Sequence, residues 1–492
     1  MTLWQLLESA PRNRVAIVAS ESGIQLTYDD LRRQVRHVAS RFAGAGIRPG
    51  DRVAIALPNG VPAIVCFLAA AVAGTAAPLN LGYRFEEFSF YLDDTSAKLL
   101  VVPPEGGEEA RRAAGDTVPV LTAELDANGN VSISGSDAST PAEPPTDDRI
   151  ALVLHTSGST GRPKRVPIPH ANLAVSAKNI METYQLTADD VSLCVMPLFH
   201  VHGLVASVLA TFLSGGAVIA PVKFNALSFW RTVRDWKVTW YSAVPTIHQL
   251  LLARAGGERP ESAAQLRFIR SCSAPLSPEN MERMENTFGV PVLEAYGMTE
   301  ASHQMSSNPL PPRARKPGSV GRGTGVEIST MDADGNLLPV GTPGEVVIRG
   351  PGVVKGYENN PEANAVSFVN GWFRTGDQGV LDDEGYLRLI GRLKEMINRG
   401  GEKISPAELD LVLLTHPAVA EAVCFGFAHS SWGEEVAAAV VLKEPATEAD
   451  LLAFCKERVA EFKRPKKIHI VETIPRTATG KIQRRAVAQA FA

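Results

Sequence analysis

Residues 150–164 read IALVLHTSGSTGRPK, an apolar run followed by a loop rich in glycine, serine and threonine. A buried strand that ends in such a loop is typical of an anion-binding turn, because glycines let backbone N–H groups approach a phosphate and hydroxyls donate further bonds. Lys164 adds a full positive charge. The spacing differs from a Walker A loop, since Gly161 comes only three residues after Gly158 and Lys164 is followed by Arg165. We therefore predict a phosphate-binding loop at the end of a strand, with a polar surface loop as the alternative.

The composition is that of an ordinary globular enzyme, with 45% hydrophobic and 21% charged residues in a chain of 492. This length exceeds one typical domain. A net charge of −4 argues against extensive nucleic-acid binding. Five cysteines without paired spacing favour a reducing compartment, with neither a disulfide framework nor a zinc knuckle. The chain starts without a signal-peptide pattern and has no apolar segment of membrane-spanning length, so we expect a cytoplasmic protein without a membrane partner.

The alternation of compact apolar segments with helix-length stretches predicts an α/β fold. The predicted strands are residues 53–57, 98–102, 150–154, 191–196, 217–220 and 239–243. Residues 64–79 predict a buried helix that runs into a strand, and residues 104–149, rich in proline, glycine and acidic side chains, predict a surface excursion.

From about residue 317 the pattern changes to shorter strands with Asp-Gly turns, which indicates a β-rich subdomain. Beyond residue 391 we expect strands at 420–427 and 437–442 and helices at 406–414 and 448–461. The predicted architecture is a large N-terminal domain, residues 1–391, with two α/β sheet subdomains and the β-rich one. A small, mobile α+β domain follows at residues 392–492.

Three further clusters carry chemistry. In residues 294–300 an apolar run again leads into a glycine turn; Tyr296 offers a ring for stacking and Glu300 an oxygen ligand suited to Mg²⁺ beside phosphates. Asp377 and Arg392 each follow a glycine, where they could bind a ribose diol or a phosphate. Lys481 ends the turn Thr-Gly-Lys. Each motif alone is common in structural turns, but their order along the chain is informative.

In that order the motifs resemble the adenylate-forming superfamily, which contains acyl-CoA synthetases, peptide-synthetase adenylation domains and beetle luciferase. The resemblance covers essentially the whole chain. Within the superfamily the chain is most similar to the oxalyl-CoA synthetases of plants, fungi and bacteria, in the stretches 197–203, 244–249, 267–274, 305–311 and 398–406. One departure is Arg165, where the family usually has glycine. How Lys164 and Arg165 divide a phosphate contact is left open by the sequence.

The resemblance implies that a carboxylic acid reacts with ATP to give an acyl-adenylate, and that CoA then displaces AMP. Lys481, Thr299 and Glu300 are the implied catalytic residues, with Glu300 as the Mg²⁺ ligand and Lys394 as the hinge of the C-terminal domain. Gly400, Gly401 and Glu402 are implied at the CoA channel. The implied ATP-binding residues are Thr156, Ser157, Gly158, Ser159, Thr160, Lys164, Ala274, Glu294, Ala295, Tyr296, Thr299, Asp377, Arg392 and Lys481.

The positions that match the family's acid pocket hold His202, Ser273 and His303, with His200 at the gate of the pocket. A second carboxylate on the substrate would need such donors, since a buried unpaired charge is costly. In close relatives these residues are associated with oxalate, which makes oxalate the favoured acid. The alternatives are structural histidines, or a metal site at His200-x-His202 that lacks a third ligand.

Other functional hypotheses are a CoA ligase for malonate, an acetate-like acid or coumarate, and an adenylation domain that loads a carrier protein. A non-catalytic nucleotide-binding protein on the same fold is a hypothesis of a different class, and luciferase-like oxygenation a remote one. The sequence predicts no oligomeric state.

Overall fold

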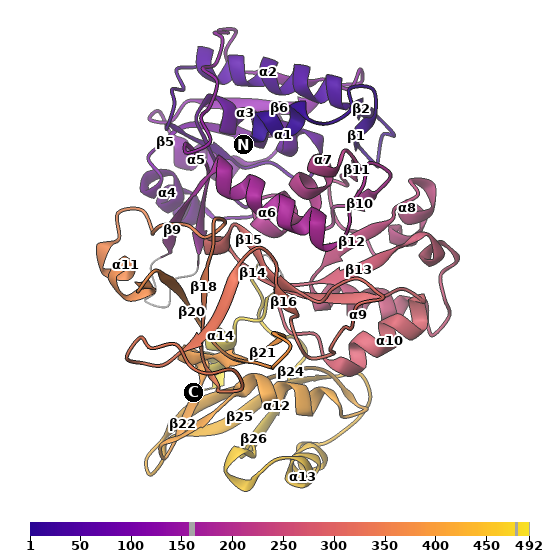
Figure 1. Ribbon diagram of the computed structural model, residues 1–492, viewed down its shortest axis with the longest axis vertical. Helices are drawn as coiled ribbons and strands as arrows, with labels where there is room; N and C mark the ends of the chain where they lie inside the picture. Colours follow the sequence, from indigo (N-terminus) through magenta and orange to yellow (C-terminus); the bar gives the residue numbers. More distant parts are fainter. Residues whose placement is uncertain (157–162, 478–480, 492) are drawn as a thin grey trace.

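The structure is a computed structural model and describes residues 1–156, 163–477 and 481–491. The described residues build two large sheets and two five-stranded sheets, and the predicted α/β architecture is confirmed (Figure 1). Within the described ranges, no helix combines the length and the apolar character that crossing a bilayer requires.

A seven-stranded sheet ends in the hairpin of β8 and β9, the two strands that flank the predicted phosphate loop. Its order is β7-β6-β5-β3-β4-β8-β9. The bounds are β3 (Arg52–Ile55), β4 (Thr75–Pro78), β5 (Ala97–Val102), β6 (Val120–Leu125), β7 (Val131–Ser134), β8 (Ile150–Thr156) and β9 (Lys164–Pro169). Helix α3 (Val61–Ala73) is apolar on all sides and buried, and it runs directly into β4 as predicted.

The prediction for residues 104–149 was wrong in part. Helix α5 (Glu108–Ala114) and strands β6 and β7 occupy much of this segment, and the two strands extend the sheet by a hairpin. Leu121 and Ala123 alternate with more exposed residues and pack into the core. Such a short alternation is easily missed among prolines, glycines and acidic residues.

A nine-stranded sheet of order β16-β15-β14-β13-β12-β10-β11-β1-β2 forms the second layer. Strands β10 to β14 are parallel neighbours, so the carboxyl ends of β12, β13 and β14 lie at the same edge. The bounds are β1 (Val15–Val18), β2 (Gln25–Thr27), β10 (Val191–Leu193), β11 (Ala217–Ile219), β12 (Trp240–Ala243), β13 (Phe268–Ser271), β14 (Val292–Met298), β15 (His303–Ser307) and β16 (Arg322–Gly323).

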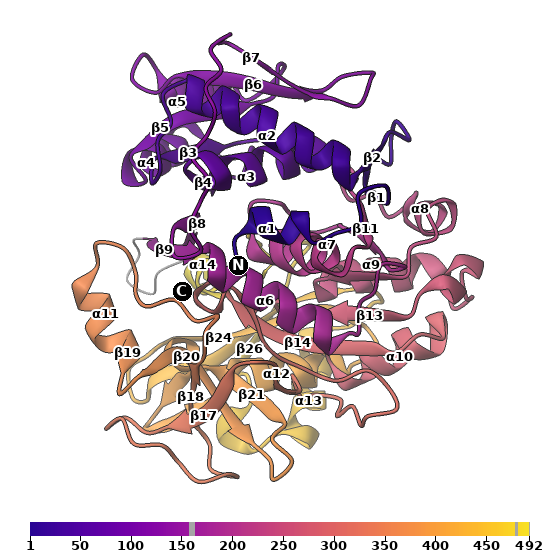
Figure 2. The ribbon, with the colours of Figure 1, turned by 45° about the horizontal axis from the view of Figure 1, so that its top comes forward.

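Helices fill the space between the two large sheets and join them into one core. Figure 2 shows α1, α6 and α7 between α3 and the strands β13 and β14. One continuous apolar cluster contains residues of both sheets and of these helices, so the two layers form a single rigid platform. The helix bounds are α1 (Leu3–Glu8), α2 (Tyr28–Gly44), α4 (Phe85–Asp94), α6 (His170–Thr183), α7 (Ala210–Ser214), α8 (Phe229–Asp235), α9 (Pro245–Ala255) and α10 (Pro278–Phe288).

The predicted β-rich region is a five-stranded antiparallel sheet of β17 (Glu327–Met331), β18 (Gly344–Arg349), β19 (Phe368–Val369), β20 (Trp372–Leu381) and β21 (Leu387–Arg392). The segment between β18 and β19 carries α11 (Pro361–Ser367). The expected domain boundary at residues 391 and 392 falls on the last residues of β21 and remains a prediction.

The last hundred residues form a separate sheet with its own core, at the bottom of Figure 1. It contains β22 (Ile397–Arg399), β23 (Glu402–Ile404), β24 (Val419–His429), β25 (Gly433–Leu442) and β26 (Lys467–Ile470), with α12 (Pro406–Leu414), α13 (Glu448–Arg458) and α14 (Arg484–Phe491). Helix α12 begins where predicted because the Ser405 hydroxyl accepts a bond from the backbone of Glu408 and Pro406 stands at the first position.

Candidate active site

Strands β8 and β9 flank the predicted phosphate loop, and Thr156 pairs with Lys164 where the two strands meet that loop. The predicted Ser157, Gly158, Ser159 and Thr160 lie outside the described residues. The Lys164 ammonium stands 4.4 Å from the centre of the Tyr357 ring. Burial lowers the pKa of Lys164, Glu300 opposes that shift, and Lys394 adds to it. The loop lysine, the predicted metal ligand and the predicted hinge therefore share one electrostatic environment.

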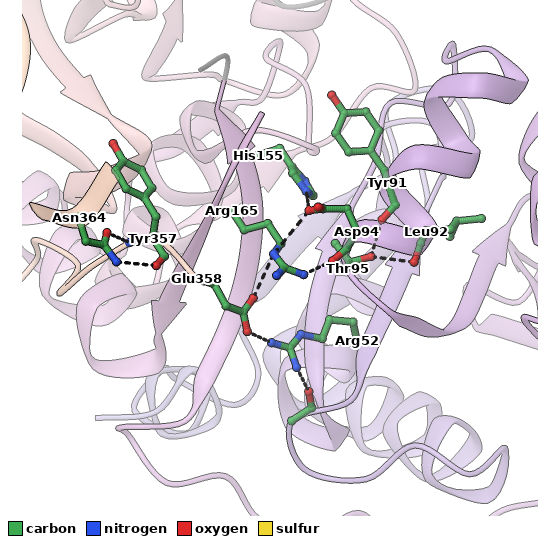
Figure 3. A network of polar contacts seen from close by, with 11 residues as sticks. Arg52, Tyr91, Leu92, Asp94, Thr95, His155, Arg165, Tyr357, Glu358 and Asn364 are labelled. Carbon is green, nitrogen blue, oxygen red and sulfur yellow. Dashed lines mark hydrogen bonds and ion pairs between the residues drawn. The ribbon is translucent and has the colours of Figure 1, made fainter. Parts of the chain in front are cut away.

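The next residue on β9, Arg165, faces away from that environment. Its guanidinium binds Asp94 and stands 3.5 Å from Glu358, which also pairs with Arg52 (Figure 3). His155 completes the network at 3.0 Å from Asp94. Consecutive residues of a strand point to opposite faces, so Arg165 ties β9 to Asp94 at the end of α4 and to Glu358, on the face opposite Lys164.

Glu300 lies in a single helical turn, Thr299–Ala301, directly after β14. It is buried, and its carboxylate accepts a 2.8 Å bond from the Tyr357 hydroxyl. Burial raises the pKa of Glu300, which Lys164 opposes. Across the described ranges no group of three or more His, Cys, Asp or Glu could hold a metal. One buried carboxylate fits Mg²⁺, which commonly takes one or two protein carboxylates and completes its shell with substrate phosphates and water.

The predicted ribose-binding pair forms across two neighbouring strands. Asp377 on β20 and Arg392 on β21 are partners in the antiparallel register, and the Arg392 Nε atom lies 2.9 Å from Asp377 Oδ1. The Tyr296 hydroxyl donates to the other carboxylate oxygen. Burial raises the pKa of Asp377, while Arg392 counteracts it. Three residues far apart in the sequence thus meet at one point.

The remaining predicted nucleotide contacts flank this pair. Ala295 is buried on β14, whereas Ala274 is exposed on the loop after β13. Glu294 is buried and its Oε1 atom accepts a bond from the backbone of Leu276 at 3.2 Å. The other oxygen, Oε2, has no hydrogen-bond partner among the described residues, and burial raises the Glu294 pKa to about 7.

The predicted acid-pocket residues His202, Ser273 and His303 are brought together at the ends of β12 to β15. His202 Nδ1 lies 3.0 Å from Ser273 Oγ, and its Nε2 atom lies 2.6 Å from Ser242 Oγ. The rings of His202 and His303 stack with centres 5.3 Å apart. Arg270, in the middle of β13, contacts the Nε2 atoms of both rings with its guanidinium, at 3.5 Å from His202 and 3.2 Å from His303. Burial lowers the pKa of both histidines, so both are neutral at physiological pH.

Backbone strain concentrates at the same place. Ser273, Ser302 and His303 have φ angles of 75°, 55° and 120°, a region that side chains other than glycine rarely adopt. Gly297 faces His303, and a Cβ atom there would stand 2.1 Å from the His303 carbonyl oxygen. The hairpin from β14 to β15 can therefore close only with glycine at this position, and the strain is typical of a functional site.

The C-terminal domain inserts Lys481 into the site. Burial lowers the pKa of Lys481 and Arg392 lowers it further, whereas Asp377 and Glu300 act in the opposite sense. The same lysine acts on His200, whose pKa burial lowers to about 3. His200 and Thr299 line a cavity of about 40 Å³. The tail lysine thus lies within electrostatic range of the predicted phosphate, ribose and acid residues.

The predicted CoA residues Gly400, Gly401 and Glu402 lie elsewhere, on the exposed hairpin between β22 and β23. There the Gly400 backbone donates a 2.8 Å bond to the carbonyl of Trp432. Figure 1 shows β22 at the lower left of the C-terminal domain, away from β14 and β15. The orientation in the structure therefore presents Lys481, and not this hairpin, to the large domain.

Sequence reasoning missed Arg270, Ser242 and Tyr357. A signal existed for Arg270, because it directly follows the apolar pair Phe268 and Ile269, and a charged residue there is costly to bury without a purpose. Ser242 and Tyr357 carry no such signal.

Comparison with known proteins extends this description. Residues 4–358 match the family of AMP-binding enzymes, and residues 408–481 match the AMP-binding enzyme C-terminal domain. The chain is 48% identical to an oxalate–CoA ligase of Arabidopsis thaliana, over 100% of this chain and 98% of that protein. It is 43% identical to an oxalate–CoA ligase of Saccharomyces cerevisiae, over 98% of this chain and 95% of that protein. The crystal structure of ATP-bound MatB from Rhodopseudomonas palustris superposes with a TM-score of 0.91 at 31% identity, over 100% of this chain and 99% of that protein.

Proposed function

The chain belongs to the AMP-binding enzyme family and is an ATP-dependent acid–CoA ligase, and on that premise we propose that its acid substrate is oxalate. ATP and CoA are its co-substrates, and Mg²⁺ is its metal ion. The observation that carries oxalate is the cluster of His202, Ser273 and His303, neutral hydrogen-bonding side chains that gather beside a buried arginine. The two relatives named oxalate–CoA ligase support the same substrate.

In the first half-reaction, one oxalate oxygen attacks the α-phosphorus of ATP, and the bond to pyrophosphate breaks. Both reactants are anions, so the reaction depends on positive charge and positioned donors rather than on a protein nucleophile. Lys481 bridges the attacking carboxylate and the α-phosphate, and Thr299 donates to that phosphate. Lys164 and the loop from Thr156 hold the β- and γ-phosphates. Glu300 binds Mg²⁺, which neutralises phosphate charge.

The nucleoside is held from two sides. Asp377 and Arg392 bind the ribose, and Tyr296 stacks on the adenine. Ala274, Glu294 and Ala295 line the adenine edge. Support for these roles comes from the geometry: Asp377 already accepts bonds from Tyr296 and Arg392, and a ribose diol would meet the same carboxylate.

In the second half-reaction the CoA sulfur attacks the acyl carbon, and the bond to AMP breaks. The domain of residues 392–492 rotates about Lys394, which withdraws Lys481 and brings Gly400, Gly401 and Glu402 to the thiol channel. The short segment between β21 and β22 supports a hinge there, because it is exposed and separates two sheets with separate cores.

The acid pocket holds the second carboxylate of oxalate through His202, Ser273 and His303, with His200 at its gate. We place the enzyme in a reducing compartment, the cytoplasm, on the support of its five buried free thiols.

A panel of acids tests this proposal. AMP release with and without CoA is measured for oxalate, malonate, acetate and 4-coumarate. We expect oxalate to give the highest kcat/KM. Higher turnover of 4-coumarate would refute a small polar pocket, and higher turnover of malonate would replace oxalate by the longer dicarboxylate. The variant Ser273→Ala should raise the KM for oxalate. Its matched control is Ser207→Ala, which alters a buried serine of the helix His202–Leu209 whose hydroxyl has no hydrogen-bond partner among the described residues.

A further inference from the structure

Arg270 is fully buried, yet every group that it contacts is uncharged. Its guanidinium forms five hydrogen bonds, to Tyr184, Ser242, His202, His303 and Gln304. Within the described residues it has no carboxylate in ion-pair contact. A buried cation without a counter-ion is costly for the folded protein, and an anion bound nearby would relieve that cost.

The five bonds leave no guanidinium N–H for a ligand, so Arg270 acts through its neighbours. His303 Nε2 lies 3.2 Å from one guanidinium nitrogen. Because arginine only donates, that histidine nitrogen must accept, and the proton of the neutral ring is on Nδ1.

The same reasoning applies to His202, which Arg270 contacts through Ser242. Arg270 donates to Ser242 Oγ at 2.9 Å, so the serine directs its own hydrogen to His202 Nε2 at 2.6 Å. The His202 proton is then also on Nδ1, which donates to Ser273 Oγ at 3.0 Å. Ser273 accepts this bond and is free to donate its hydroxyl hydrogen to a ligand.

We propose that Arg270 is a positioning residue that holds His202 and His303 in the Nδ1–H form, and thereby aims the Ser273 hydroxyl and the His303 Nδ1–H at the distal carboxylate of the acid. The identity of that acid rests on the proposed function; the arrangement of protons does not. The strained backbones of Ser273 and His303 fix the direction of both donors.

The charges around the two histidines act in one direction. Besides burial, the cations Arg270 and Lys481 both lower the pKa of His202 and of His303. The rings stay neutral donors, and the surrounding positive potential favours a substrate with two negative charges over one with a single charge.

The proton positions are tested directly by ¹⁵N NMR of the histidine-labelled wild-type enzyme, with signals assigned by loss in His202→Gln and His303→Gln. We expect both rings to be protonated at Nδ1 and unprotonated at Nε2. An Nε2–H signal for either ring in the wild type would overturn the proposal, whichever acid the enzyme uses. In Arg270→Met the Nδ1–H signature should be lost, and in Arg270→Lys it should be retained.

Kinetics provide the second test, with Arg267→Met as the matched control, because Arg267 directly precedes the same strand but pairs with Asp190. In Arg270→Met the KM for oxalate should rise about a hundredfold or more, as two buried donors are misdirected. The KM for ATP and the pyrophosphate exchange with glyoxylate, which lacks the second carboxylate, should change less than about threefold. An equal loss with oxalate and glyoxylate would show a structural role only. Absence of oxalate turnover in the wild type would refute the proposed substrate, while the NMR result would still decide the role of Arg270.

Discussion

Replacing Asp377 by asparagine isolates the charge of the proposed ribose site, because the side chain keeps its shape and its place between Tyr296 and Arg392. A hydrogen bond to a carboxylate contributes about 1.5–3 kcal/mol and one between neutral groups about 0.5–1.5 kcal/mol. If the two hydroxyls of the ribose donate to Asp377, the substitution weakens binding by about 2–3 kcal/mol. That loss corresponds to a rise in the KM for ATP of about 30- to 150-fold.

The assay is the initial rate of AMP release at saturating oxalate and CoA, with ATP varied. The KM for oxalate should be unchanged. Burial raises the pKa of Asp377, so its charge is costly in the free protein and the thermal midpoint should hardly fall. The matched control is Asp382→Asn, which removes a half-exposed carboxylate that pairs with Lys316 at 2.6 Å in the turn after the same strand. A KM for ATP in Asp377→Asn within about threefold of the control would refute the ribose assignment.

Three other perturbations probe separate parts of the mechanism. Lys481→Ala should lower oxalate-dependent ATP–pyrophosphate exchange about 100- to 1000-fold but hardly affect thioester formation from supplied oxalyl-adenylate, and an equal loss in both half-reactions contradicts its role. Glu300→Gln should raise the Mg²⁺ concentration for half-maximal activity about tenfold or more, and an unchanged midpoint in a magnesium titration excludes it as the ligand. Burial lowers the pKa of His248 from 6.5 to about 3 in the folded enzyme. As the pH falls from 6.5 towards 3, the unfolded chain takes up a proton that the folded enzyme does not, so the folded enzyme loses stability. When the pH is lowered from 7.5 to 5.5, the free energy of unfolding by urea should therefore fall by about 1.4 kcal/mol less in His248→Gln than in the wild type. An identical fall in both proteins would show that His248 is protonated in the folded state.

Several elements were predictable because their determinants are local. The strand at residues 150–154 needs only an apolar run, and the helix at 406–414 needs only a capping serine and a proline at its start. Strands β6 and β7 were not predicted, since their stability comes from pairing with β5 and from the core beneath them, which the local pattern hardly records.

The residues of the candidate site also fall into two groups, those that a local sequence pattern reveals and those that it does not. The glycine turns and the residues that follow them were recognisable as motifs, because each motif is a short, continuous stretch. The role of Arg270 was not recognisable in the sequence, because it depends on contacts with Ser242 and His303, which lie on other strands. Likewise, only the strand geometry separates Lys164, which faces Tyr357 and Glu300, from Arg165, which faces Asp94.

The amino-acid sequence alone determined which chemical groups are available, and from it we predicted a phosphate loop, a metal-binding carboxylate, a ribose-binding carboxylate, polar residues for a small acid and a lysine on a terminal domain. The tertiary structure decided which of these groups meet. Strand register sets Asp377 opposite Arg392, and domain placement brings Lys481 to both. The physical reason is that residue type is a local property, whereas electrostatic coupling depends on distances set by the packing of segments remote in the chain.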